Sequence, residues 1–218
     1  MQPRALVVCA LVVTSPLVLG CKKGFGSGFE GEITMHIQTG SSSSDLVVKT
    51  KSDKMRFETK AADGSLNYSV FDPATNKLTM VMEGQKSYMA MDFSKRGTPQ
   101  ANTSPDSVAI EKSGKHETIA GVDCEDWTAK APSGKRSEVC IASGIAFFDL
   151  GSAKSGSSGG GLAKELRDKK LFPLRSVEYD ADGKELNRME VTKIEKKSFD
   201  DSEFSVPKDY KEITLPTP

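Results

Sequence analysis

The residues best suited to chemistry in this 218-residue chain are its four cysteines. Cys124 and Cys140 lie within the body of the chain, where two thiols can form a disulfide or, with further ligands, hold a metal ion. The histidine nearest to them in sequence is His116, and two thiols with one histidine at this irregular spacing match no zinc template. We therefore favour a Cys124–Cys140 disulfide, and a metal site that includes His116 is the alternative.

The other two cysteines, Cys9 and Cys21, belong to an N-terminal export signal. An almost wholly apolar run over residues 5–19 is short for a membrane-spanning helix, and Gly-rich polar sequence follows it. The run ends in the letters VLGC, which resemble the lipobox of bacterial lipoproteins. This resemblance implies cleavage before Cys21 and acylation of that cysteine. An ordinary secretory signal with an incidental cysteine is the alternative.

The export signal divides the chain into three parts. Residues 1–20 are expected to be a lipoprotein signal peptide, residues 21–28 a lipidated flexible tether rich in glycine and polar residues, and residues 29–218 a single domain. Lys22 stands where an aspartate would signal inner-membrane retention in many such lipoproteins, so the resemblance implies a lipid-anchored protein of the cell envelope at the outer membrane. That compartment is oxidising, which supports the disulfide.

Four of the eight methionines form a second group of interest. If the chain turns at Gly84-Gln85, residue 80 opposes residue 89 and residue 78 opposes residue 91, so all four side chains share one face. They are Met80, Met82, Met89 and Met91. Three interpretations stay open: packing of an irregular core, an adaptable lining for acyl chains, and Cu(I) binding by thioether sulfurs, the last being the minor one.

Enzymatic chemistry finds little support in the sequence. The two histidines, His36 and His116, fall on or before strands at positions that favour exposure, and no nucleophile elbow, zinc-protease, P-loop or dinucleotide motif is present. We expect no catalytic residue, no metal and no cofactor. The formal net charge of +0 removes the electrostatic argument for a nucleic-acid partner.

The elements that position these residues are mostly strands. Residues 29–38 alternate strictly between apolar and polar, as a half-buried strand requires. Asp63-Gly64 predicts a two-residue hairpin turn, which places one set of side chains on a common face: Met55, Phe57, Thr59, Leu66, Tyr68 and Val70. Similar signals give about eleven strand candidates, at 29–38, 45–51, 55–61, 66–72, 78–82, 87–91, 116–119, 124–130, 136–142, 174–180 and 185–194, with a further short one at 108–112.

Helix is expected in one place only. Residues 143–150 are apolar, and residues 162–171 carry Leu162 and Leu166 at helical spacing, with Pro173 as a terminator. A Gly/Ser run between the two segments predicts a hinged cover. The expected fold is mainly β: a single half-open antiparallel β-barrel with a short helical lid or plug.

Four segments carry a resemblance to a known family: ETIAGVDCEDW at 117–127, EVCIASG at 138–144, LFPLRS at 171–176 and FSVPKDYKEI at 204–213. They look like the pattern of an uncharacterised family of bacterial lipoproteins with a domain of unknown function, which is similar to the LolA/LolB-like fold of periplasmic lipoprotein carriers. The resemblance implies an architecture that binds a hydrophobic ligand or an acylated partner, and it brings no catalytic residues.

We therefore expect a non-enzymatic, membrane-anchored lipoprotein that binds a hydrophobic ligand or acylated protein on the concave face of the barrel. The residues expected to line that face are Ile33, Met35, Phe57, Tyr68, Met80, Met82, Met89 and Met91. The alternative is a structural or interaction lipoprotein whose barrel is filled by its own side chains.

Overall fold

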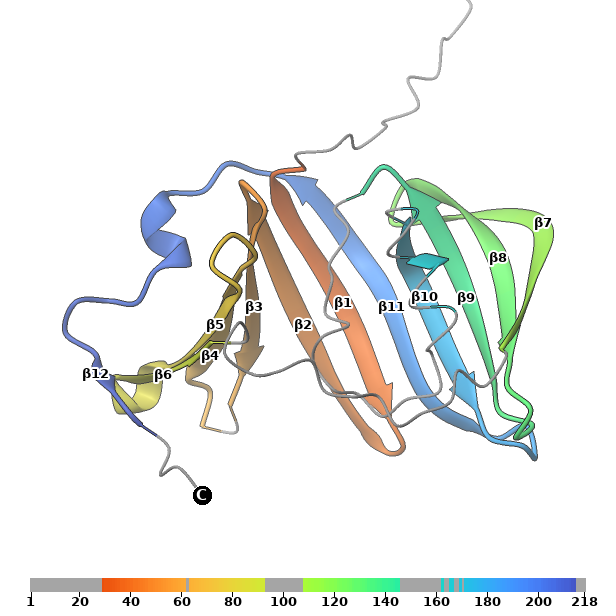
Figure 1. Cartoon of the computed structure of the whole chain (residues 1–218), viewed down its shortest axis with the longest axis horizontal. Helices are drawn as coiled ribbons and strands as arrows, with labels where there is room; N and C mark the ends of the chain where they lie inside the picture. Colours follow the sequence, from red (N-terminus) through yellow and green to blue (C-terminus); the bar gives the residue numbers. More distant parts are fainter. Residues whose placement is uncertain are drawn as a thin grey trace, which may run out of the picture.

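The computed structural model of the chain describes residues 29–61, 63–92, 108–145, 162, 165–166, 169 and 171–214. The strands in this part of the chain form a single 12-stranded sheet with the order β12-β6-β5-β4-β3-β2-β1-β11-β10-β9-β8-β7 (Figure 1). They are β1 (Gly31–Thr39), β2 (Ser42–Lys51), β3 (Lys54–Lys60), β4 (Leu66–Asp72), β5 (Lys77–Met82), β6 (Ser87–Asp92), β7 (Ala109–Ile119), β8 (Val122–Lys130), β9 (Arg136–Ser143), β10 (Leu171–Tyr179), β11 (Glu185–Lys196) and β12 (Lys211–Glu212).

The sheet is open and strongly curved, with β12 and β7 at its two ends (Figure 1). Buried side chains from β1 and β2 pack in one cluster with side chains from β8, β9 and β10. Val191 of β11, the strand between β1 and β10, belongs to the same cluster, so these side chains form one continuous buried layer on one face of the sheet. The mainly β, half-open antiparallel architecture predicted from the sequence is confirmed.

Most predicted strands appear close to their expected bounds, and one pair is merged. The candidates at 108–112 and 116–119 are parts of the single strand β7, whose register against β8 shifts between Lys112 and His116. Gly114 has a φ of +68° within this irregular stretch, a backbone conformation that glycine adopts without strain. The polar residues between the two candidates predicted a break between two strands. A local bulge accommodates these residues within one continuous strand.

The loop between β3 and β4 is one residue longer than predicted. The turn closes between Ala61 and Ser65, whose backbone atoms pair at 2.8 Å, and Gly64 takes the left-handed conformation with a φ of +82°. A three-residue loop of this kind shifts the register by one relative to a two-residue turn. Phe57 therefore opposes Ser69, and Tyr68 opposes Glu58.

This shift decides which side chains share a face, because neighbouring residues of a strand point to opposite sides. Tyr68 and Val70 lie on the face opposite to Phe57, and the prediction that these three side chains share one face is wrong.

The predicted helical lid is not confirmed. Of residues 143–171, the structure describes residues 143–145, 162, 165–166, 169 and 171, and the rest of the predicted lid lies outside the described residues. Leu162 and Leu166 are helical and pack on a cluster that contains Trp127. Leu171 begins β10, and Pro173 lies within that strand beside a register shift, where the missing N–H of proline is tolerated.

The C-terminal segment covers the outer face of β4–β6. Phe199 and Phe204, from the chain around the short 3-10 helix η3 (Asp201–Phe204), form a buried cluster with Tyr68 and Val81, and Figure 1 shows this segment on the outer side of the curved sheet. It then adds β12 to the edge of β6. Because this segment lies outside the curve of the sheet, the opposite face of β4–β6 is the concave one.

No helix among the described residues is long and apolar enough to cross a membrane. The predicted signal peptide and tether, residues 1–28, lie outside the described residues.

Candidate functional site

The four methionines lie on one face of the β5–β6 hairpin, as the sequence predicts. Met80 directly opposes Met89, Leu78 opposes Met91, and Met82 opposes Ser87. The turn itself consists of the 3-10 helix η1 (Glu83–Gln85) and Lys86, which adopts the left-handed conformation with a φ of 46°. The register around Gly84-Gln85 is confirmed.

The methionines continue a row of side chains that crosses six strands. Each residue of this row directly opposes the next in the sheet register: Ile33, Val48, Phe57, Ser69, Met80 and Met89. Directly opposed residues point to the same side of a sheet. We call this side of β3–β6, with Met80, Met82, Met89 and Met91, the methionine face. Ile33, Met35 and Phe57 extend it onto the core cluster, whereas Tyr68 lies on the outer face.

Burial falls along the row from β1 to β5. Ile33 and Val48 are fully buried, Phe57 is partly buried against the same core cluster, and the side chain of Met80 is 40% exposed. Met80, Met82, Met89 and Met91 are absent from the three core clusters that the described residues form. The core-packing interpretation does not hold for Met80. The methionine face adjoins the core, and the polar residues Asn67, Ser69 and Ser87 lie on it among the apolar side chains.

Tyr68 takes no part in this surface. It is 4% exposed, and the guanidinium of Arg56 lies 3.6 Å from the centroid of its ring. Burial raises the pKa of its hydroxyl. A pocket of about 190 Å³ also lies on this outer face, between β4, β5 and the C-terminal segment, with Val70, Asp72, Lys77 and Phe204 among its lining residues.

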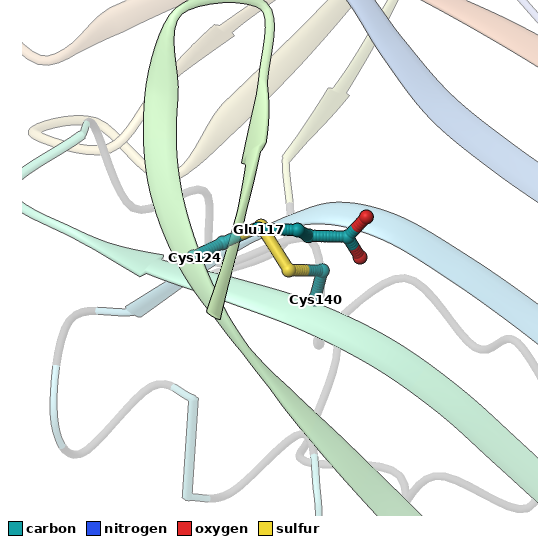
Figure 2. A group of neighbouring side chains, drawn as sticks. All are labelled: Glu117, Cys124 and Cys140. Atoms are coloured by element: carbon teal, nitrogen blue, oxygen red, sulfur yellow. A yellow bond between two sulfur atoms is a disulfide. The ribbon is translucent and has the colours of Figure 1, made fainter. Parts of the chain in front are cut away.

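The disulfide between Cys124 and Cys140 is present, as predicted (Figure 2). Both residues are almost completely buried, and Glu117 opposes Cys124 with its carboxylate within 4.8 Å of both sulfur atoms. His116 opposes Glu125 and pairs instead with Asp123, at 3.0 Å between Nδ1 and Oδ2. The third potential ligand is therefore Glu117 and not His116, and the bonded sulfurs offer no thiolate to a metal.

We expect loss of this disulfide to destabilise the domain. The two cysteines are 16 residues apart, and closing a loop of that size contributes about 3 kcal/mol in the chain-entropy description. Urea unfolding of a Cys124→Ala/Cys140→Ala variant should show a loss of this order, because alanine replaces each buried sulfur without adding a buried polar group. Wild-type protein unfolded in reductant should lose a similar amount. Equal stability of wild type and variant would contradict the prediction.

A charged cluster adjoins the disulfide. Arg175 on β10 makes two hydrogen bonds to the carboxylate of Glu117 and lies 3.4 Å from Asp126. The hydrogen bond from Arg175 lowers the pKa of Glu117, whereas burial and the neighbouring Glu117 carboxylate raise the pKa of Asp126. Sequence analysis did not find this cluster, because its members lie on three strands and resemble ordinary surface charges.

An Arg175→Gln substitution should cost about 1 kcal/mol near neutral pH and less near pH 3. Glu117 has a lowered pKa in the fold, so its contribution is present above its ordinary pKa of 4.5 and is lost as the pH falls through the folded value. Asp126 has a raised pKa, and the penalty for its charge disappears at low pH as well. Urea unfolding at both pH values measures this difference.

The matched control is Arg188→Gln, which breaks a single partly buried pair with Glu185. This pair includes no second carboxylate of raised pKa, so the control should lose only a few tenths of a kcal/mol. A loss for Arg175→Gln that is the same at both pH values would contradict the assigned role of Glu117.

The comparisons with known proteins identify a family without assigning it an activity. A family described as "Domain of unknown function (DUF4412)" matches residues 29–210. The chain belongs to this family. The sequence-based recognition of an uncharacterised family with a domain of unknown function is therefore confirmed. A search of curated proteins gave no match.

A solved structure with a TM-score above 0.5 supports the fold alone, and two others are similar at lower scores. An uncharacterized conserved protein from Thermus thermophilus matches with a TM-score of 0.53 and 13% identity over 86% of this chain and 91% of that one. The MucA/MucB complex of Pseudomonas aeruginosa matches with a TM-score of 0.41 and 11% identity over 85% of this chain and 58% of that one. A LolA superfamily protein from Nitrosomonas europaea matches with a TM-score of 0.32 and 10% identity over 82% and 90%.

Proposed function

We propose that this DUF4412 protein is a lipid-anchored protein of the cell envelope whose methionine face binds a hydrophobic ligand, either a free acyl chain or the acyl chain of a partner protein. The observation that carries the proposal is the 40% exposure of Met80, which lies in a row of side chains that begins in the core.

The chemistry of methionine suits this role. Its unbranched side chain has three rotatable bonds and a polarisable sulfur, so a methionine surface adapts its shape to an irregular apolar partner. Leu78 lies on the same face of β5 as Met80 and Met82, and it adds a branched side chain opposite Met91. Each methylene of a ligand buried here would contribute about 0.8 kcal/mol.

The structure also bounds the size of the site. Toward β1 and β2 the concave side is filled, because Ile33 and Val48 are fully buried in the core cluster. The open part spans β3–β6 in width and Leu78–Met82 in length, or about 14 Å by 13 Å from ordinary strand spacing and rise. A surface of this size fits one acyl segment.

The proposed lipid anchor would keep this surface close to a membrane. The VLGC sequence supports acylation of Cys21, and residues 22–28 are rich in glycine and polar residues, as a flexible tether requires. Ligand exchange with lipid or with neighbouring lipoproteins would then take place at the outer membrane surface.

One observation favours the second candidate, an interaction lipoprotein without a small ligand. Ile33, Val48, Leu174 and Val191 close the middle of the concave side with their own side chains. In that case the methionine face would contact another protein and would not take up an acyl chain.

Titration with a fluorescent fatty acid tests the proposal. The unacylated chain from residue 22 onward keeps every described residue and needs no detergent that would compete for the site. Saturable binding, with competition by unlabelled fatty acids that strengthens with chain length, is the expected result. Absence of saturable binding by a folded protein would favour the second candidate. Cu(I) titration against a weak chelator tests the remaining interpretation of the methionines, which requires competition with the chelator.

A further inference from the structure

The described methionines differ widely in their access to solvent. Met80 is 40% exposed, whereas Met35 and Met55 are 6% and 5% exposed. Met82, Met89 and Met91 have intermediate exposure. The chain therefore places its most accessible described thioether on the face proposed to bind an acyl chain, with Met89 directly opposite, and keeps other thioethers inside the core.

Access decides how fast a thioether is oxidised. A sulfur lone pair attacks one oxygen of hydrogen peroxide, the O–O bond breaks, and after proton transfer the products are a sulfoxide and water. The sulfur is oxidised and the peroxide is reduced, so the step needs no further reactant. Sulfoxide formation converts a flexible apolar side chain into a polar one, and methionine sulfoxide reductases reverse it.

Oxidation of Met80 should leave the fold stable, because the packed side chains of β5 lie on the opposite face of the hairpin. Val81, the neighbour of Met80 in β5, points to the opposite side and is buried with Tyr68 in the outer cluster. Met80 itself belongs to none of the three core clusters of described residues. A sulfoxide at Met80 would therefore add a polar group to the methionine face without entering the packed core.

We propose that Met80, together with Met89 opposite, is a reversible oxidation site that switches the methionine face from an apolar to a polar surface and thereby releases its acyl ligand. The release rests on the proposed function, whereas the selective oxidation does not. Peroxide and hypochlorous acid are the classes of oxidant that fit this chemistry.

Graded hydrogen peroxide treatment of the chain from residue 22 onward, followed by peptide mass spectrometry, measures the selectivity. We expect Met80 to oxidise first, Met82, Met89 and Met91 to follow, and Met35 and Met55 to oxidise last, roughly tenfold more slowly than Met80. Equal rates at Met80 and Met35 in protein with native circular dichroism would overturn the proposal.

Fatty-acid titration of the same samples measures the switch. Affinity should fall in step with oxidation of Met80 and Met89 and return after treatment with methionine sulfoxide reductases. A Met80→Leu/Met89→Leu variant keeps the apolar surface, so its affinity should resist peroxide. Selective oxidation with unchanged affinity would overturn the switch, whereas wild-type protein that binds no fatty acid before oxidation would overturn the proposed function.

Discussion

Replacement of Met82 and Met89 by aspartate is expected to weaken binding of a fluorescent fatty acid roughly tenfold or more, while the circular dichroism of the β-sheet is retained. Two carboxylates on the methionine face must lose hydration when an acyl chain covers them, and this desolvation opposes binding. Met82 and Met89 are both partly exposed, so carboxylates at these positions can stay hydrated in the unliganded fold. Titration and circular dichroism on one sample separate the two effects.

The hairpin offers a matched control for the added charge. Gln85 and Ala90 are exposed on the same hairpin, and a Gln85→Asp/Ala90→Asp variant introduces two carboxylates without altering a methionine. This control should bind the fatty acid like wild type. Loss of binding in the control would point to net charge as the cause. Unfolding of the methionine variant would show that these side chains are packed core, and the interaction-lipoprotein interpretation would become the better one.

The strands and hairpins could be predicted from apolar–polar alternation and from turn residues, because both patterns depend on residues close in sequence. Residues 29–38 alternate between apolar and polar, and Gly31, Ile33 and Met35 are buried in β1 as this pattern requires. The β5–β6 register also followed from its turn, with Met80 opposite Met89. These features depend on contacts between residues close in sequence.

The position of Tyr68 shows where local reasoning ends. Asp63-Gly64 predicts a hairpin correctly, but both two-residue and three-residue loops can carry this pair. The choice between them moves every later side chain of β4 to the other face. The carboxylate of Asp63 accepts hydrogen bonds from the backbone N–H and the hydroxyl of Ser65. These hydrogen bonds fix the three-residue loop, and the resulting register places Tyr68 on the outer face.

The outer cluster could not be predicted because its partners are distant in sequence. Phe199 and Phe204 meet Tyr68 and Val81 only after the chain has completed the sheet. Arg175 likewise meets Glu117 and Asp126 through the order of β7, β8, β9 and β10, which no local pattern encodes. The local loop therefore decided which face Tyr68 occupies, and long-range packing decided which side chains cover it there.

The second large effect concerns the anchor. A Cys21→Ala substitution in the full chain should abolish acylation and cleavage by the lipoprotein signal peptidase, because the thiol of this cysteine is the predicted acyl acceptor. Several acyl chains, at about 0.8 kcal/mol per buried methylene, make membrane attachment effectively permanent, so the predicted lipid anchor depends entirely on this one cysteine.

Mass spectrometry of the N-terminus in wild type and variant measures the Cys21→Ala effect directly. The matched control is Cys9→Ala, which removes a cysteine from the predicted signal peptide and should leave processing and acylation unchanged. The uncleaved signal of the Cys21→Ala variant can itself hold the chain at a membrane, so membrane fractionation alone does not decide the question. An acylated N-terminus in the Cys21→Ala variant would contradict the anchor assignment, and cleavage before residue 21 without acylation in wild type would favour an ordinary secretory signal.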